Sequence, residues 1–335
     1  MKHLLALFAL PALALFSGCD KKSDTASVGD KPGKKLTIAL LPKSKGNQFF
    51  LTCEKGARKA ANEIGAELLF DGPTNNDPAK QNEIVENWIT LGVDAIAAAS
   101  QNKDGISTPL KKAREKGITV VTYDSDANPD ARAFFVNQAT PQSIGHILMD
   151  TAAQLCGEEG EFAIITGTLT AGNLNAWRGF IEGRLAEKYP KMKLLDTKPC
   201  DDDKDKAQQE AANLLSAYPN IKCIMAITSP AVPGAAEAVK QAGKAGAVKV
   251  LGLGLPSENR AYVKEGVTQA VILWNLDDLG YLTLKATAAV ATGALKPGAT
   301  EFDAGRLGKL KVEGDNILLG QPIVFTKENI DQFDF

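Results

Sequence analysis

The sequence predicts an α/β protein made of two doubly wound lobes, each built on a parallel sheet. Short runs rich in Val, Ile, Leu and Ala alternate with amphipathic segments of helical length. This alternation is typical of parallel strands covered by helices on both faces. It occurs twice, with a break near 137–140. Of the 335 residues, about 300 remain after an N-terminal leader and tether, which is enough for two cores of ordinary domain size.

The first cycle opens with the apolar run LTIALLP, which is followed by a segment of helical spacing that ends at Gly65. We expect strands at 36–42, 66–72, 93–100, 118–126 and 131–138, and helices at 47–65, 78–91 and 105–116.

The second cycle repeats the same order of elements and ends with a long Ala-rich helix and a tail of short strands. We expect strands at 162–166, 192–197, 223–228, 248–253 and 269–274, helices at 173–189, 203–218, 233–243, 258–265 and 279–292, and short strands within 307–325.

The N-terminus has the pattern of an export signal. A basic residue precedes the apolar run 4–16, which is shorter than the roughly 20 residues that a membrane-spanning helix needs. The segment then reads Ser17-Gly18-Cys19, which resembles a bacterial lipobox except that Phe16 stands where Leu, Val or Ile is preferred. The resemblance implies a lipoprotein signal peptide at 1–19 and lipidation of Cys19. Plain secretion and an unprocessed leader remain as alternatives.

A polar, charged stretch at 20–35 follows and lacks apolar periodicity, so we expect a disordered tether. The net charge is −2, and no run of basic residues is interleaved with aromatics, so we expect no nucleic-acid partner.

Cysteines and histidines do not form a metal or redox motif. No C-x-x-C occurs, and His3 and His146 are far apart, so we expect neither a metal nor a cofactor. Two interpretations of the cysteines after the leader stay open. In the first, Cys200 and Cys223 pair in an oxidising compartment. In the second, all four of these cysteines are buried free thiols, namely Cys53, Cys156, Cys200 and Cys223.

Motifs of nucleotide binding and nucleophilic catalysis are missing. The fragment 252–254 lacks the third glycine of a dinucleotide fingerprint, no G-x-S-x-G occurs, and His146 lies in an expected helix. We therefore do not expect an enzyme.

Ligands of doubly wound sheets bind at the carboxyl ends of the strands. Carboxylates and amides bind neighbouring hydroxyls, and aromatic faces pack on sugar rings. A structural Lys43–Asp124 ion pair is the alternative role for those two residues. The candidate ligand-binding residues at the strand ends are Lys43, Phe50, Asn102, Asp124, Asp126, Asn173, Asn175, Trp177, Ser229, Trp274 and Asn275.

Glycoside hydrolysis needs two carboxylates that flank the bond. Asp124 and Asp126 share one strand end, and we expect asparagines rather than carboxylates on the opposing lobe. Binding without turnover is therefore favoured.

Several runs together resemble a known family: LTIALLPKSKGNQFF, FDGPTNNDPAKQ, GVDAIAAAS, VVTYDSD, FVNQATPQSIG and the closing IVFTKENIDQFDF. They are similar to the class I periplasmic binding proteins of bacterial ABC importers, in the branch that binds rhamnose and autoinducer-2. The resemblance implies a type I fold with a three-crossing hinge, closure on a ligand, docking on an ABC permease and a monomer. It also implies lobe one at 36–136 plus 277–315 and lobe two at 137–276 plus 316–335.

The resemblance carries over to the site residue by residue. Lys43 and Asp124 match a lysine and an aspartate that hold the ligand in autoinducer-2 binders. The autoinducer-2 binders also have an Asp-Gln pair before a tryptophan, and this chain has Asn173 and Leu174 before Trp177 instead. Their Pro-x-Ala segment corresponds to 227–229, which reads Ile-Thr-Ser here. An apolar Leu174 adds a twelfth candidate and favours a rhamnose-like deoxysugar. The alternatives are a receptor that passes autoinducer-2 or another furanosyl signal to a sensor, and an extracytoplasmic α/β carbohydrate-active enzyme.

Overall fold

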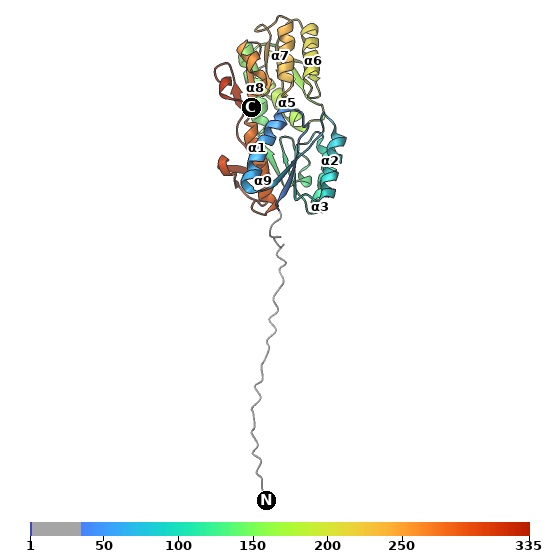
Figure 1. Ribbon diagram of the computed structural model, residues 1–335. Helices are drawn as coiled ribbons and strands as arrows, with labels where there is room; N and C mark the ends of the chain where they lie inside the picture. The colour runs from blue at the N-terminus through green and yellow to red at the C-terminus, as the bar shows by residue number, and fades with distance from the viewer. Residues whose placement is uncertain (2–34) are drawn as a thin grey trace. The chain divides into compact units, whose positions relative to one another are not determined.

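The computed structural model describes Met1 and residues 35–335. Cys19 and nearly all of the leader and tether lie outside the described residues. Residues 35–335 form two α/β lobes, one on an eight-stranded sheet and one on a six-stranded sheet (Figure 1). This confirms the predicted fold class, although each sheet also has antiparallel strands at an edge. Within residues 35–335, no helix combines the length and the apolar character needed to cross a bilayer.

The first lobe has the strand order β11-β12-β13-β5-β4-β3-β1-β2. Every residue of β3 and β5 is buried, as expected for parallel strands with helices on both faces. The strands are β1 (Thr37–Leu41), β2 (Glu67–Phe70), β3 (Ala95–Ala98), β4 (Thr119–Tyr123), β5 (Phe134–Asn137), β11 (Glu301–Asp303), β12 (Lys309–Glu313) and β13 (Asn316–Leu318).

Four α-helices belong to this lobe: α1 (Gln48–Ile64), α2 (Pro78–Leu91), α3 (Lys103–Glu115) and α9 (Leu276–Ala291). Each begins after an Asn or Asp whose side chain accepts a hydrogen bond from a free N–H of the first turn. Helices α1 and α9 lie side by side (Figure 1). Their backbones approach so closely that a Cβ at Gly280 would lie 1.7 Å from the carbonyl oxygen of Cys53.

The second lobe has the strand order β14-β10-β9-β8-β6-β7. Helix α4 packs with α5, and α6 packs with α7. The strands are β6 (Gly160–Thr166), β7 (Met192–Pro199), β8 (Ile221–Ala226), β9 (Lys249–Leu253), β10 (Ala270–Leu273) and β14 (Ile323–Phe325). The helices are α4 (Pro141–Cys156), α5 (Gly172–Lys188), α6 (Lys204–Ala217), α7 (Ala231–Gln241) and α8 (Pro256–Lys264).

Short 3₁₀ helices complete the described secondary structure, at Pro129–Ala131, Gly305–Leu307 and Ile330–Gln332. Several bounds differ from the sequence-based expectation, and two of the differences have a clear physical reason. Helix α7 begins at Ala231 rather than Pro233, because proline is tolerated in the first turn of a helix. The three-residue strand β11 was not expected, because so short a segment carries no clear periodicity.

The chain passes between the lobes after β5, after β10 and after β13. The boundary expected at 315 is too early. Strand β13 pairs in parallel with β5, with Ile317 opposite Val136, so it belongs to the first sheet and the third passage follows Leu318.

Candidate ligand-binding site

A cavity lies between the lobes, at the carboxyl ends of the parallel strands. It encloses about 440 Å³ of space between atoms, part of it open to solvent. Lobe one contributes Lys43, Asn47, Phe49, Phe50 and Asp124. Lobe two contributes Asn173, Leu174, Trp177, Asp202, Ile227, Thr228, Ser229, Leu253, Leu273 and Trp274.

Lys43 and Asp124 form the polar side of lobe one. Lys43 follows β1, Asp124 follows β4, and Lys43 Nζ lies 3.7 Å from Asp124 Oδ2 with both side chains buried. Asp124 has a positive φ of 57°, an unusual conformation for a residue other than glycine, and such strain is often found at functional sites. Gln138 Nε2 donates to the Asp124 carbonyl at 3.2 Å and holds this turn.

Burial raises the pKa of the Asp124 carboxyl above its usual value. The Lys43 ammonium opposes the shift, and the Asp202 carboxylate from the other lobe adds to it. Ionised Asp124 is therefore under-solvated, and hydroxyl donors from a ligand would compensate for the water that it lacks.

Lys43 also connects the two lobes. Its Nζ donates to Asn173 Oδ1 at 3.0 Å, and Asn173 lies in the first turn of α5. A second contact across the cleft runs from Asn76 Nδ2 to the Asp201 carbonyl. The two lobes are thus in direct polar contact across the cleft.

Four aromatic rings and four aliphatic side chains form the apolar wall. Trp274 makes edge-to-face contacts with Phe49 and Trp177, with ring centroids 6.2 and 6.0 Å apart. Phe50 packs edge-to-face against Phe49 at 4.9 Å. Within the described residues, the buried Trp274 Nε1–H has no hydrogen-bond partner, so the wall holds a donor that a ligand oxygen would satisfy.

A profile of the periplasmic binding protein domain matches residues 38–295, which is most of the folded part. The chain belongs to the periplasmic binding protein family. This periplasmic binding protein is 30% identical over 280 residues to the D-ribose/D-allose-binding protein of Pseudomonas aeruginosa, a match that covers 79% of this chain and 85% of that relative.

Two solved structures are similar over nearly their whole length. A solute-binding protein from Clostridium phytofermentas with bound L-rhamnose is 31% identical with a TM-score of 0.86, covering 90% of this chain and 98% of that one. LsrB from Clostridium saccharobutylicum in complex with AI-2 is 26% identical with a TM-score of 0.86, covering 89% of this chain and 100% of that one. The chain is thus a type I periplasmic binding protein of the class that serves sugar ABC importers, a family of the periplasm or cell exterior whose members are binding proteins rather than enzymes.

Eight of the twelve candidate residues line the cavity, and Asp202 is a charged lining residue that was not among the candidates. Asp202 comes from lobe two, so the expectation of no carboxylate on that lobe is wrong. Thr228 Oγ1 donates to Asp202 Oδ1, and Gly167 makes room for this approach, because a Cβ there would lie 2.6 Å from that oxygen and 2.8 Å from Leu174 Cδ1. The signal that could have found Asp202 was its position after β7, a strand end that the sequence reasoning left out.

Three candidate asparagines serve the local backbone instead of the cavity. Asn102 caps α3 by accepting from Gly105 N at 2.8 Å, and Asn275 caps α9 by accepting from Asp278 N at 3.2 Å. Asn175 is exposed and donates to the Leu169 carbonyl at 2.8 Å. None of the three lines the cavity.

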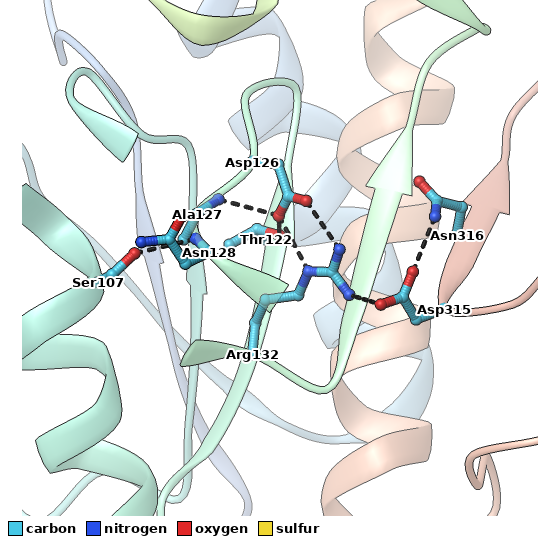
Figure 2. A network of polar contacts seen from close by, with 8 residues as sticks. All are labelled: Ser107, Thr122, Asp126, Ala127, Asn128, Arg132, Asp315 and Asn316. Atoms are coloured by element: carbon cyan, nitrogen blue, oxygen red, sulfur yellow. Dashed lines mark hydrogen bonds and ion pairs between the residues drawn. The ribbon is translucent and has the colours of Figure 1, made fainter. Parts of the chain in front are cut away.

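Asp126 also lies outside the cavity lining, in a separate polar network of lobe one (Figure 2). Its carboxylate accepts hydrogen bonds from Arg132 Nε and Nη2 at 3.0 and 2.7 Å, and from the Ala127 N–H at 2.9 Å. Arg132 Nη1 reaches the Asp315 carboxylate, just before β13. Through the buried Arg132, this network links the turn after β4 to the residue that precedes β13.

Arg132→Met is expected to lower the free energy of unfolding by about 2 kcal/mol, because it leaves the partly buried Asp126 carboxylate without its cation. Urea denaturation measures the change. The matched control is Arg58→Met, which removes an exposed pair with Glu54 on α1 and should cost less than ~0.5 kcal/mol. Equal effects of the two substitutions would contradict the structural role of Arg132, and ligand affinity should be unchanged in both.

Proposed function

We propose that this binding protein captures a small sugar in the cavity and delivers it to an ABC permease, with a 6-deoxysugar such as L-rhamnose as the favoured ligand. The observation that carries the proposal is the division of the cavity into a polar side and an apolar side. Lys43 and Asp124 form the first, and Leu174, Trp177 and Trp274 contribute to the second.

The polar side suits neighbouring hydroxyl groups. Asp124 accepts hydrogen bonds, Lys43 donates them, and Asn173 provides both functions. Asp202 and Ser229 add an acceptor and a hydroxyl from lobe two. A ligand held by all of these contacts both lobes at once, which favours the closed arrangement of the protein.

The apolar side suits a sugar carbon that lacks a hydroxyl. Leu174 is buried, lines the cavity and offers no hydrogen bond. A 6-hydroxyl placed against it would lose water without gaining a partner, whereas a methyl group would pack there favourably. The comparisons support the sugar class, since the similar proteins include one solved with L-rhamnose and one named for ribose and allose.

Leu174→Gln is expected to weaken discrimination between L-rhamnose and L-mannose, which differ only in the hydroxyl on carbon 6. The unaltered protein should bind L-rhamnose about 10-fold or more tightly than L-mannose, because burying an unpaired hydroxyl costs roughly 1–3 kcal/mol. The amide introduced by the substitution would supply a partner for that hydroxyl and reduce the ratio. Isothermal titration calorimetry of both sugars measures it.

Leu253→Gln is the matched control, since Leu253 lines another part of the wall. If the unaltered protein binds the two sugars equally, the deoxysugar proposal is wrong while sugar binding itself stands. If both substitutions change the ratio alike, Leu174 is not the residue that contacts carbon 6.

A signal receptor for a furanosyl ligand is the second candidate, favoured by the similarity to LsrB in complex with AI-2. The Lys43–Asp124 pair in the cavity also fits the lysine and aspartate that the sequence resemblance implies for autoinducer-2 binders. Titration with AI-2 beside L-rhamnose separates the two.

The expected absence of a lobe-two carboxylate no longer argues against hydrolysis of a bound carbohydrate, because Asp202 is present. The assignment as a binding protein rests on the relatives instead.

A lipid anchor at Cys19 and a monomeric state are also proposed. The support for the anchor is the Ser17-Gly18-Cys19 sequence after a short apolar run. Cys19→Ser should move the protein from the membrane fraction to the released fraction in its native host, as followed by immunoblotting after ultracentrifugation. Membrane association that survives the substitution would refute the anchor.

A further inference from the structure

Two cysteines lie close together in lobe two, away from the ligand cavity. Cys156 is the last residue of α4, and Cys223 lies in β8, against which α4 packs. Cys223 is fully buried, whereas Cys156 is partly exposed, and both are free thiols. Lys222, the chain neighbour of Cys223, and Lys249, its register partner in β9, line the same surface groove as Cys156, which places the two cysteines close together.

The pairing considered from the sequence, Cys200 with Cys223, does not occur. Cys200 follows the carboxyl end of β7 beside Asp202, whereas Cys223 lies in the first half of β8. Strand β6 separates β7 from β8 in the sheet. The near partner of Cys223 is therefore Cys156, which lies before β6 in the chain.

Cys156 opens onto a surface groove with three lysines. The groove is lined by Leu155, Cys156, Glu159, Gly160, Lys191, Lys222, Gly246, Ala247 and Lys249. Lys249 of β9 is in register with Cys223 of β8, so their side chains lie on the same face of the sheet. An accessible thiol therefore lies beside several cations, with a second thiol behind it.

This environment favours the Cys156 thiolate. The Cys223 thiol, and then the Lys249 and Lys222 ammonium groups, lower the pKa of Cys156 against the opposing effect of burial. The Cys156 thiol and burial raise the pKa of Cys223. Of the two, Cys156 is thus the nucleophile that a disulfide donor meets first.

We propose that Cys156 and Cys223 form a disulfide after export, with Cys156 as the attacking thiol. The Cys156 thiolate attacks a sulfur of a disulfide donor of the oxidising compartment, and one donor thiolate leaves. The Cys223 thiol then loses its proton and attacks the Cys156 sulfur of the mixed disulfide, and the second donor thiolate leaves. Two protein thiols are oxidised to one disulfide, and the donor disulfide is reduced to two thiols that take up the two protons.

The cross-link would join the end of α4 to β8 entirely within lobe two. It would close a loop that contains β6, α5, β7 and α6, which restricts the unfolded chain and raises the melting temperature. Neither cysteine lines the ligand cavity, so sugar affinity should be the same in the oxidised and reduced forms.

The test uses the purified reduced protein with oxidised glutathione as the donor, followed by alkylation in denaturant and peptide mapping by mass spectrometry. We expect a Cys156–Cys223 cross-linked peptide, a mass ~2 Da lower before alkylation, and alkylated Cys53 and Cys200. A higher melting temperature of the oxidised form is expected as well. A lasting glutathione adduct on Cys156 with Cys223 free, or no reaction at Cys156, would overturn the proposal.

Two variants identify the order of the steps. Cys223→Ser should stop at the mixed disulfide and retain one glutathione on Cys156. Cys200→Ser is the matched control and should form the cross-link as the unaltered protein does. Cross-linking of Cys200 in the unaltered protein would contradict the assigned pair.

Discussion

Replacing Asp124 by asparagine is expected to weaken sugar binding by about 2–5 kcal/mol, a rise in Kd of ~30-fold or more. The buried carboxylate would lose the charge that accepts ligand hydroxyls, and Lys43 would lose its partner at 3.7 Å. Asparagine is the appropriate replacement because it tolerates the positive φ of 57° better than alanine does. Isothermal titration calorimetry with L-rhamnose, or with the tightest sugar found, measures the loss.

Asp126→Asn provides a matched control two residues away. Asp126 pairs with Arg132 outside the cavity lining, so its substitution should lower stability and leave affinity unchanged. An Asp124→Asn variant that binds as tightly as the unaltered protein would remove Asp124 from the site.

The same substitution is expected to change how the stability of the ligand-free protein depends on pH. Burial raises the pKa of Asp124, so the folded state binds this proton more tightly than the unfolded chain does. Ionised Asp124 therefore costs stability above the raised pKa, and that cost decreases as the pH falls from the raised pKa to the ordinary pKa of the unfolded chain. The free energy of unfolding of the unaltered protein should approach that of Asp124→Asn as the pH is lowered. A difference that stays constant with pH would contradict this.

Asn173→Ala is expected to weaken sugar binding by about 10- to 100-fold and to open the ligand-free protein. Its Oδ1 accepts the hydrogen bond from Lys43 across the cleft at 3.0 Å, and hydrogen bonds to charged groups contribute roughly 1.5–3 kcal/mol. Affinity falls further when the closed state is less populated. Calorimetry measures the first effect, and a larger radius of gyration in small-angle X-ray scattering reports the second.

Asn175→Ala tests the specificity of this effect. Asn175 lies on the same helix but bonds only within lobe two, so its loss should alter neither affinity nor radius of gyration. In a Lys43→Met background, Asn173→Ala should cost much less, because the interaction is already absent. Additive losses in the double variant would show that the two side chains act independently.

The fold was largely predictable because its signals are local. Buried parallel strands are apolar throughout, and the helices between them begin at side-chain caps and often end at glycines, as at Asn47 and Gly65 of α1. The chain passage after Leu318 was misplaced, because a three-residue strand carries too little pattern to show which sheet it joins.

The site was less predictable because residues at the same kind of position in the chain can take either of two roles. The residue between a parallel strand and the next helix either caps that helix or faces the ligand, and Asn102 and Asn275 took the first role. Asp124 and Asp126 were both expected at the end of the strand at 118–126, and side chains two residues apart on a strand point to the same side. Strand β4 ends at Tyr123 and Asp124 adopts a left-handed conformation, so the alternation stops before either carboxylate.

Native mass spectrometry with a panel of L-rhamnose, L-mannose, D-ribose, D-allose and AI-2 tests whether the protein binds a small sugar and releases it unaltered. We expect a one-to-one complex with at least one sugar, loss of that complex in Asp124→Asn, and release of the sugar with unchanged mass after long incubation. If none of the sugars in the panel forms a complex, or if a sugar is released with altered mass, the proposed sugar-binding function is contradicted.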